Sequence, residues 1–210
     1  AVDCVLSGEA DAAFCAVRPP GHHAEPEAPM GFCLFNNAAI AAFYAREAYG
    51  VKRPAIVDFD VHHGNGTQAA FWSDPALFYA SIHQFPFYPG TGAANEHGGA
   101  DNIVNAPVRA GASAQMWREA FAQTILPKLS AFAPDLLIVS AGFDAHKNDP
   151  LASLGLDAED FAWATAELLK AVKAGQPGGV RGIVSCLEGG YDLDALRESA
   201  AAHVGALLDA

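Results

Sequence analysis

The sequence predicts an α/β protein with three layers (α/β/α), in which helices cover both faces of a mostly parallel central sheet. Apolar, β-rich runs alternate along the chain with longer helical patterns, and this alternation is typical of βαβ units. The apolar runs show no clean apolar–polar alternation, which indicates strands covered on both faces. The length of 210 residues and the hydrophobic content of 51% fit one domain, residues 1–210, with one well-buried core.

Five strands and three main helices account for this pattern. The strands are expected at residues 14–17, 55–61, 77–82, 136–140 and 183–187, and the helices at residues 37–49, 113–132 and 158–173. Ser113 and Asp157 can each accept hydrogen bonds from the free N–H groups that begin a helix, and Gly175 ends the last one. Pro127 lacks the N–H group that a helix interior needs, so it predicts a kink or a break. The Gly/Pro-rich stretches 18–31 and 85–99 are expected to be long loops, which usually carry function on such a scaffold.

The composition excludes several classes of protein. With a formal net charge of −12, the surface repels phosphate backbones, so no direct nucleic-acid partner is expected, whereas cationic substrates are attracted. No run approaches ~18 consecutive apolar residues, so no membrane span is expected. Four cysteines without a CxxC pair fit reduced thiols in a cytoplasmic protein. The chain opens without Met inside a helical pattern that ends at Gly8, and we therefore expect an N-terminally truncated domain.

The densest group of polar, ionisable residues lies at 56–66, where a buried strand runs into two histidines and two glycines. Because side chains alternate along a strand, Asp58, Asp60 and His62 are expected to project to the same side. Burying two carboxylates without a partner is unfavourable, and a divalent metal ion would remove that penalty. The carboxyl ends of strands in open α/β sheets are also where ligands bind. The alternative is that both aspartates cap the loop and the histidines are solvated.

A third ligand is expected from the buried strand that ends near Asp144, because its carboxylate would emerge on the same rim. Three protein ligands leave a coordination position open, as catalytic zinc requires. Two carboxylates and one imidazole also accept Fe²⁺. Taken alone, Asp144 is equally well explained as the cap of a helix or turn. His146 is placed outside the ligand set by its offset in the sequence.

Two further segments carry groups suited to proton transfer. His22 and His23 stand in a loop stiffened by Pro and Gly, where they would lie near a metal-bound water. Asp58 and Asn65 are natural partners to orient them. Tyr191 follows two glycines after the last strand, and a phenolic O–H beside a metal is an oxyanion donor. Both segments also have simpler interpretations, namely a surface histidine pair and an aromatic side chain packed after a turn.

Several motifs together resemble the zinc-dependent histone deacetylase family of the arginase/deacetylase superfamily. The nearest resemblance is to its bacterial class II-like branch, which includes acetylpolyamine amidohydrolases. The motifs occur in the expected order and cover nearly the whole chain: RPPGHH at 18–23, MGFCLFNN at 30–37, DFDVHHGNGTQ at 58–68, SIHQFPFYPGTG at 81–92, SAGFDAH at 140–146, DPLA at 149–152 and LEGGYDLDAL at 187–196. The resemblance implies an arginase/deacetylase-like fold, and family members carry about a hundred further residues before the position of Ala1.

The resemblance also implies a role for each matching residue. The zinc ligands would be Asp60, His62 and Asp144. The catalytic residues would be His22 paired with Asp58, His23 paired with Asn65, and Tyr191. The walls of a narrow acyl-lysine tunnel would be Gly31, Phe32, Tyr88 and Leu151. Structural K⁺ or Na⁺ ions are implied at two sites, one near Asp58, Asp60, His62, Ser81 and Ile82, and another near Phe71, Asp74 and Leu77.

The expected reaction is the zinc-dependent hydrolysis of an N-acetylated amine, such as a protein acetyl-lysine or an acetylpolyamine, to a free amine and acetate. His23 would act as general base and then acid, His22 as electrostatic support, and Tyr191 as oxyanion donor. Two alternatives stay open: an arginase-like ureohydrolase with two manganese ions, and a protein that binds acetylated lysine without turnover. An oligomer is compatible with the resemblance, because polyamine-type members use a dimer to narrow their entrance.

Overall fold

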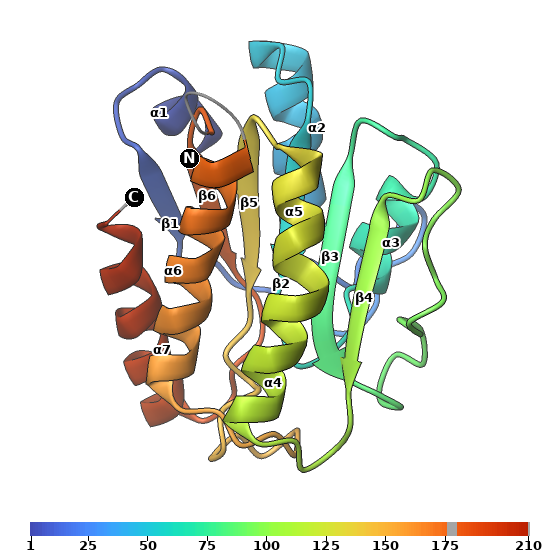
Figure 1. The fold of residues 1–210 in the computed structure, drawn as a ribbon, viewed down its shortest axis with the longest axis vertical. Helices are drawn as coiled ribbons and strands as arrows, with labels where there is room; N and C mark the ends of the chain where they lie inside the picture. The colour runs from blue at the N-terminus through green and yellow to red at the C-terminus, as the bar shows by residue number, and fades with distance from the viewer. Residues whose placement is uncertain (176–179, 210) are drawn as a thin grey trace.

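Six parallel strands form the central sheet, with helices on both of its faces (Figure 1). The computed structural model describes residues 1–175 and 180–209. The strand order is β1-β6-β5-β2-β3-β4, and each neighbouring pair is parallel. This architecture confirms the predicted three-layer α/β fold.

The predicted strands are present with small shifts of their ends: β1 (Ala12–Cys15), β2 (Pro54–Asp58), β3 (Phe78–Gln84), β5 (Leu136–Ala141) and β6 (Ile183–Leu187). Strand β2 ends at Asp58 and not at residue 61, so Asp60 and His62 lie in the loop that follows it. The sixth strand, β4 (Ile103–Val108), is not among the predicted ones, because Asn105 and Pro107 interrupt its apolar run. Its position at the edge of the sheet tolerates a proline.

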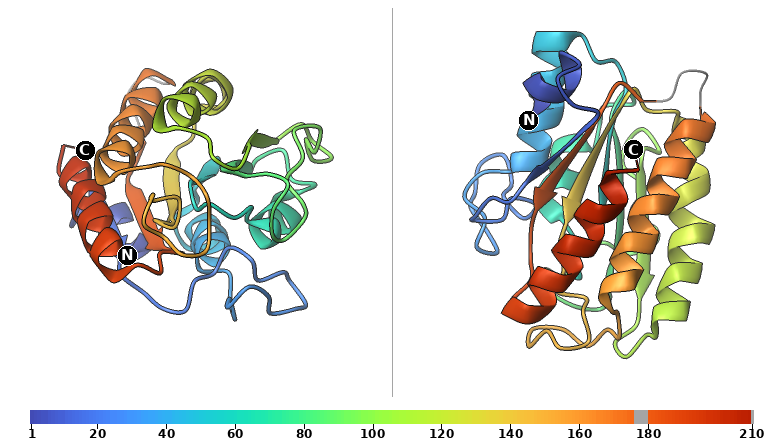
Figure 2. Two further views of the ribbon diagram at one scale, coloured as in Figure 1. Left: turned by 90° about the horizontal axis from the view of Figure 1, so that it is seen from below. Right: turned by 90° about the vertical axis from the view of Figure 1, so that its left-hand side faces the viewer.

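The helices form the two outer layers (Figure 2). One face of the sheet is covered by α1 (Val2–Leu6), α2 (Asn37–Tyr49) and α3 (Asn65–Phe71), and the other by α4 (Ala114–Ala120), α5 (Leu126–Phe132), α6 (Ala158–Gly175) and α7 (Leu193–Leu207). The sequence does not predict α3 and α7, because both start within or next to Gly-rich motifs that usually form turns. The side chain of Asp157, expected to cap α6, pairs with Lys147 instead. None of the described helices is long and apolar enough to cross a membrane.

The helix predicted at residues 113–132 is interrupted, as Pro127 predicts. Helix α4 begins after Ser113, whose hydroxyl accepts a hydrogen bond from the Met116 N–H at 3.4 Å. A π-helical segment, Phe121–Ile125, joins α4 to α5, and Pro127 lies in the first turn of α5. Proline cannot donate to the carbonyl group four residues earlier, and its ring would clash with that group. The wider π turn just before it accommodates both effects.

Two apolar cores lie between the sheet and the helix layers. Along β2, Ala55 and Val57 enter the core shared with α4–α7, whereas Ile56 enters the core shared with α1–α3. The alternation continues past the end of the strand, since Phe59 and Val61 still enter the first core. This alternation therefore places the side chains of residues 58, 60 and 62 together on the side that faces away from the core shared with α4–α7.

The parallel arrangement also decides where the functional loops lie. All six strands point the same way, so their carboxyl ends meet at one edge of the sheet, at the bottom of Figure 1. The loops after β1, β2, β5 and β6 gather at this edge, as the view from below in Figure 2 shows. Ligands of open α/β sheets bind at this edge.

Candidate active site

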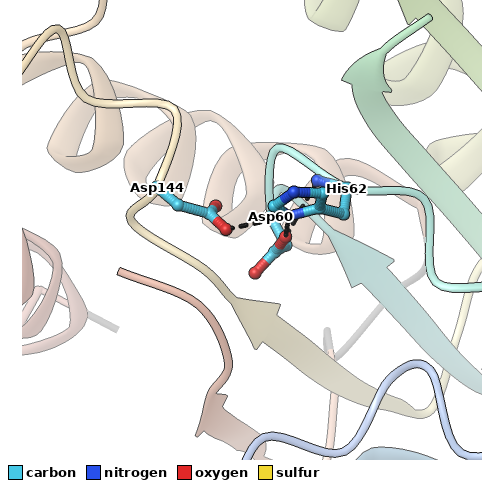
Figure 3. Close-up of side chains that lie close together, drawn as sticks. All are labelled: Asp60, His62 and Asp144. Carbon is cyan, nitrogen blue, oxygen red and sulfur yellow. Dashed lines mark hydrogen bonds and ion pairs between the residues drawn. The ribbon is translucent and has the colours of Figure 1, made fainter. Parts of the chain in front are cut away.

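Three potential metal ligands meet at the carboxyl edge of the sheet (Figure 3). Asp60 and His62 follow β2, and Asp144 follows the neighbouring strand β5. The Nδ1 atom of His62 lies 3.1 Å from Asp60 Oδ1 and 3.0 Å from Asp144 Oδ2. One ligand atom of each residue lies within 4.8 Å of the other two, and both carboxylates are fully buried. Two buried carboxylates and an imidazole at this spacing fit a divalent cation such as Zn²⁺ or Fe²⁺.

Backbone N–H groups hold the two carboxylates of this cluster in place. Asp60 accepts a hydrogen bond from the Gly189 N–H at 2.7 Å, and Asp144 accepts one from the Val61 N–H at 2.8 Å. A Cβ atom at Gly189 would overlap the Asp144 carboxylate, so only glycine allows the chain to approach this closely. The loop after β6 is thus tied to the cluster although it supplies no ligand.

The tandem histidines lie beside the cluster, in the loop after β1. His22 Nδ1 is 2.9 Å from Asp58 Oδ2. His23 Nδ1 is likewise 2.9 Å from Asn65 Oδ1. The Nδ2 group of Asn65 donates to the Glu25 carboxylate at 2.7 Å, which leaves Oδ1 as the acceptor for His23. In its neutral form, His23 therefore carries its proton on Nδ1 and has an unprotonated Nε2.

The two histidines have opposite electrostatic environments. Burial by itself would lower the pKa of His22, but the carboxylates of Asp58 and Asp60 outweigh that effect and raise this pKa well above its ordinary value. Burial and the neighbouring charge of His22 lower the pKa of His23 to about 3. These shifts favour the protonated cation of His22 and the neutral base form of His23.

Tyr191, in the loop between β6 and α7, lines the same cavity as His62. Burial raises the pKa of its phenol, and the carboxylates of Asp60 and Asp144 raise it further above neutral pH, where a phenol is protonated in any case. The backbone N–H of Tyr191 donates to Asp149 Oδ2 at 2.7 Å. Its ring centroid lies 6.1 Å from that of Phe32.

Glu188 and Asp149 organise the site, although the sequence pattern assigns neither of them a role. The fully buried Glu188 follows β6, and its Oε2 accepts hydrogen bonds of 2.6 and 3.1 Å from two backbone N–H groups of the histidine loop. Asp149 holds the backbone of Tyr191 and of the next residue. The available sequence signals were an acidic residue directly after a buried strand, and the DPLA motif. Both residues thus position the segments that carry the site's polar groups.

An apolar cavity of about 490 Å³ adjoins the cluster, and it is lined by His23, Gly31, Phe32, His62, Phe87, Tyr88, Leu151 and Tyr191. The four residues that the resemblance places in a tunnel wall all lie there. Phe87 also lines the cavity, although the resemblance did not assign it to the wall. Its ring stacks on that of His62 with a centroid distance of 5.2 Å. Gly31 has a φ of +54°, and a Cβ atom there would overlap the ring of His23. Glycine is therefore required at this turn of the cavity wall.

The residues implied at two monovalent-cation sites lie in different settings. Asp58 and Ser81 are register partners on β2 and β3, and Ile82 is the next residue of β3. The second set lies in the turn between α3 and β3. There the side-chain amide of Asn102 donates to the carbonyl oxygens of all three residues, Phe71, Asp74 and Leu77.

Comparison with known proteins gives consistent matches along the chain. Residues 1–207 match the histone deacetylase domain family. An uncharacterized protein of Synechocystis sp., slr0245, is 50% identical over 198 residues, which are 94% of this chain and 62% of that protein. Histone deacetylase 10, chloroplastic, of Oryza sativa subsp. japonica is 48% identical over 191 residues, which are 90% of this chain and 42% of that protein.

Two solved structures share the fold. The HD domain of HDA15 has a TM-score of 0.90 and 41% identity, and the match covers 99% of this chain and 59% of that chain. An acetylpolyamine aminohydrolase from Burkholderia pseudomallei has a TM-score of 0.87 and 35% identity, with 98% of this chain and 58% of that chain covered. The chain thus spans less than two thirds of the length of each relative. Because the domain match covers nearly the whole chain and both folds agree with it, this chain belongs to the histone deacetylase family.

Proposed function

We propose that the protein is a metal-dependent amidohydrolase that removes acetyl groups from N-acetylated amines. One observation carries this proposal: the cluster of Asp60, His62 and Asp144 adjoins an apolar cavity whose wall also contains His23 and Tyr191. Amide hydrolysis needs a polarised carbonyl, an activated water and a proton for the leaving amine. These groups are chemically suited to all three tasks, and membership of the family supports the same reaction.

The metal ion would be held by Asp60, His62 and Asp144, and Zn²⁺ and Fe²⁺ both suit these ligands. Such an ion polarises a bound acyl carbonyl and lowers the pKa of a bound water toward ~7. Within residues 1–175 and 180–209, this is the single group of three potential ligands at metal-binding spacing. An arginase-like ureohydrolase would need further carboxylates to bridge a second ion, so the mononuclear reaction is better supported.

The remaining polar groups would divide the proton transfers between them. His23 has a low pKa and an unprotonated Nε2, so it would accept a proton from the attacking water and then donate it to the leaving amine. The raised pKa of His22 beside Asp58 favours its protonated form, which would stabilise the negative charge that develops on the acyl group. Tyr191 would donate its O–H to the same developing oxyanion.

The cavity and the overall charge favour a cationic acylated amine as substrate. Phe32, Phe87 and Tyr88 provide an apolar passage suited to the methylene stem of an acetyl-lysine or an acetylpolyamine. The net charge of −12 attracts cations. The names of the relatives point to both substrate classes, since one is an acetylpolyamine aminohydrolase and another a histone deacetylase. We therefore propose that both classes be assayed side by side.

Removal of the metal ion is expected to abolish turnover. A chelator should slow the hydrolysis of an acetyl-lysine peptide and of N-acetylputrescine at least about 100-fold, and addition of Zn²⁺ or anaerobic Fe²⁺ should restore it. Chromatographic detection of the free amine measures the rate, and elemental analysis should give about one ion per chain. The Asp144→Asn variant serves as the matched control, because it keeps the shape of the side chain but lowers metal affinity.

Two results of this experiment would contradict the proposal. A folded, metal-loaded chain that binds the acetyl-lysine peptide without hydrolysing it would indicate a binding protein. Two ions per chain, together with release of urea from a guanidino substrate, would indicate a ureohydrolase.

Replacement of Asn65 by Asp is expected to shift the pH dependence of kcat/KM. A carboxylate against Nδ1 favours the protonated imidazole and raises the pKa of His23, which is about 3 in the wild type. The base works only when unprotonated, so kcat/KM falls as the pH drops through this pKa. The acid limb of the Asn65→Asp variant should therefore lie at a higher pH than that of the wild type, by about one unit or more. Rate profiles that extend from about pH 3 to 9 measure this shift, and coincident acid limbs would show that His23 is not the base.

A further inference from the structure

The turn between α3 and β3 brings three backbone carbonyl oxygens onto one nitrogen atom. Asn102 Nδ2 lies 2.8 Å from Phe71 O, 3.1 Å from Asp74 O and 2.9 Å from Leu77 O. Phe71 is the last residue of α3, where carbonyl groups lack a partner within the helix. The three oxygens therefore form a group of convergent acceptors, and the side-chain amide of Asn102 provides their shared donor, beside the backbone N–H groups that also donate to Phe71 O and Asp74 O.

The surroundings determine which end of the Asn102 amide faces these carbonyls. Asn102 is 5% exposed, and its Oδ1 is buried without a hydrogen-bond partner among the described residues. With the amide turned over, Oδ1 would face three carbonyl oxygens, which are acceptors like itself. The observed orientation keeps three hydrogen bonds and leaves one oxygen unsatisfied. The interaction of Nδ2 with the carbonyls therefore dominates the placement of this side chain.

These carbonyls belong to the residues at which the family resemblance implies a second K⁺ or Na⁺ ion. We infer that the side-chain amide of Asn102 takes the place of that ion in this chain. Its two N–H groups satisfy oxygens that would otherwise attract a cation, and its nitrogen occupies the position on which the oxygens converge. Residues 71, 74 and 77 therefore do not fit a monovalent cation while Asn102 is in place. This inference is independent of the proposed hydrolysis.

Removal of the amide is expected to create a K⁺ site. The Asn102→Ala variant leaves the three carbonyl oxygens convergent and without their shared donor. The matched control is Asn105→Ala, on strand β4. Asn105 is 4% exposed, its Nδ2 donates to Gln68 and Glu96, and its Oδ1 also lacks a partner among the residues described. The control removes an equivalent buried amide but keeps the Asn102 bonds.

Thermal unfolding of the full chain measures the difference between these proteins. The Tm of each is compared in KCl and in tetramethylammonium chloride at equal ionic strength. We expect Asn102→Ala to gain about 3–6 °C more from K⁺ than the wild type gains, and Asn105→Ala to gain the same as the wild type. A cation bound elsewhere contributes equally to all three proteins and cancels. Equal gains in all three would overturn the inference.

Diffraction from wild-type crystals soaked in Tl⁺ tests the same inference without a variant. The anomalous signal of Tl⁺ marks positions that accept K⁺. We expect no such signal within coordinating distance of the carbonyl oxygens of Phe71, Asp74 and Leu77. A Tl⁺ ion bound to these oxygens, with the Asn102 side chain displaced, would overturn the inference even if Asn102→Ala does not fold.

Discussion

Tyr191→Phe is expected to lower kcat for deacetylation by about 10²–10³-fold, the loss typical of removing one oxyanion donor. The substitution removes only the phenolic O–H group, which is protonated at neutral pH because its pKa, raised further by burial, lies well above that pH. KM should change by less than about threefold, since the ring that lines the cavity beside Phe32 is retained. Steady-state kinetics with the acetyl-lysine peptide measure both constants.

The control for this prediction is Tyr88→Phe, which removes the same hydroxyl from another tyrosine of the cavity wall. Tyr88 is 46% exposed and lies at the rim, so we expect its kcat to stay within about threefold of the wild type. Metal content should be unchanged in both variants. If Tyr191→Phe retains a kcat within threefold of the wild type as well, Tyr191 does not stabilise the oxyanion.

Phe59→Ala is expected to cause the largest loss of stability, about 3–5 kcal/mol in the free energy of unfolding. The ring is fully buried and lies 6.0 Å from the ring of Phe143, 5.9 Å from Phe161 and 5.6 Å from His203, measured between centroids. Its removal leaves a cavity where the loops after β2 and β5 pack against α6 and α7. Urea unfolding followed by circular dichroism measures the loss.

The matched substitution on the surface is Leu193→Ala, at the start of α7. This side chain is 79% exposed, so its removal should change the free energy of unfolding by no more than about 0.5 kcal/mol. A loss below about 1 kcal/mol for Phe59→Ala would mean that the core collapses into the space left by the ring.

Local sequence predicted those helices and strands whose apolar pattern and capping residues lie within the element or directly next to it. Residues 183–187 form β6 and residues 37–49 form α2 with the predicted bounds. All residues of β6 are buried, and α2 begins with the side chain of Asn36 as cap and ends at Gly50 in the left-handed conformation. Strand β4 could not be predicted in this way, because Asn105 and Pro107 fit a strand only at the edge of this sheet.

In the candidate site too, some features follow from local sequence and others depend on contacts between distant segments. Alternation along β2 predicts that Asp58, Asp60 and His62 share one side, which is a local property of the chain. The distance from His62 to Asp144, which lies 82 residues later, depends on the pairing of β2 with β5. Glu188 accepts a hydrogen bond from a backbone N–H group 167 residues earlier, and no pattern around position 188 specifies that partner.

By itself, the sequence determined the layered parallel fold, the family, and which residues carry the polar groups of the site, because these depend on periodicity, residue type and motifs. The tertiary structure alone decided that Glu188 holds the histidine loop and that Asp149 holds Tyr191. It also decided that the side-chain amide of Asn102 donates to the three backbone carbonyl oxygens at the turn between α3 and β3. These roles arise from contacts between segments far apart in the chain. Whether a buried carboxylate or amide meets a donor, an acceptor or a cation is settled only when the sheet brings those segments together.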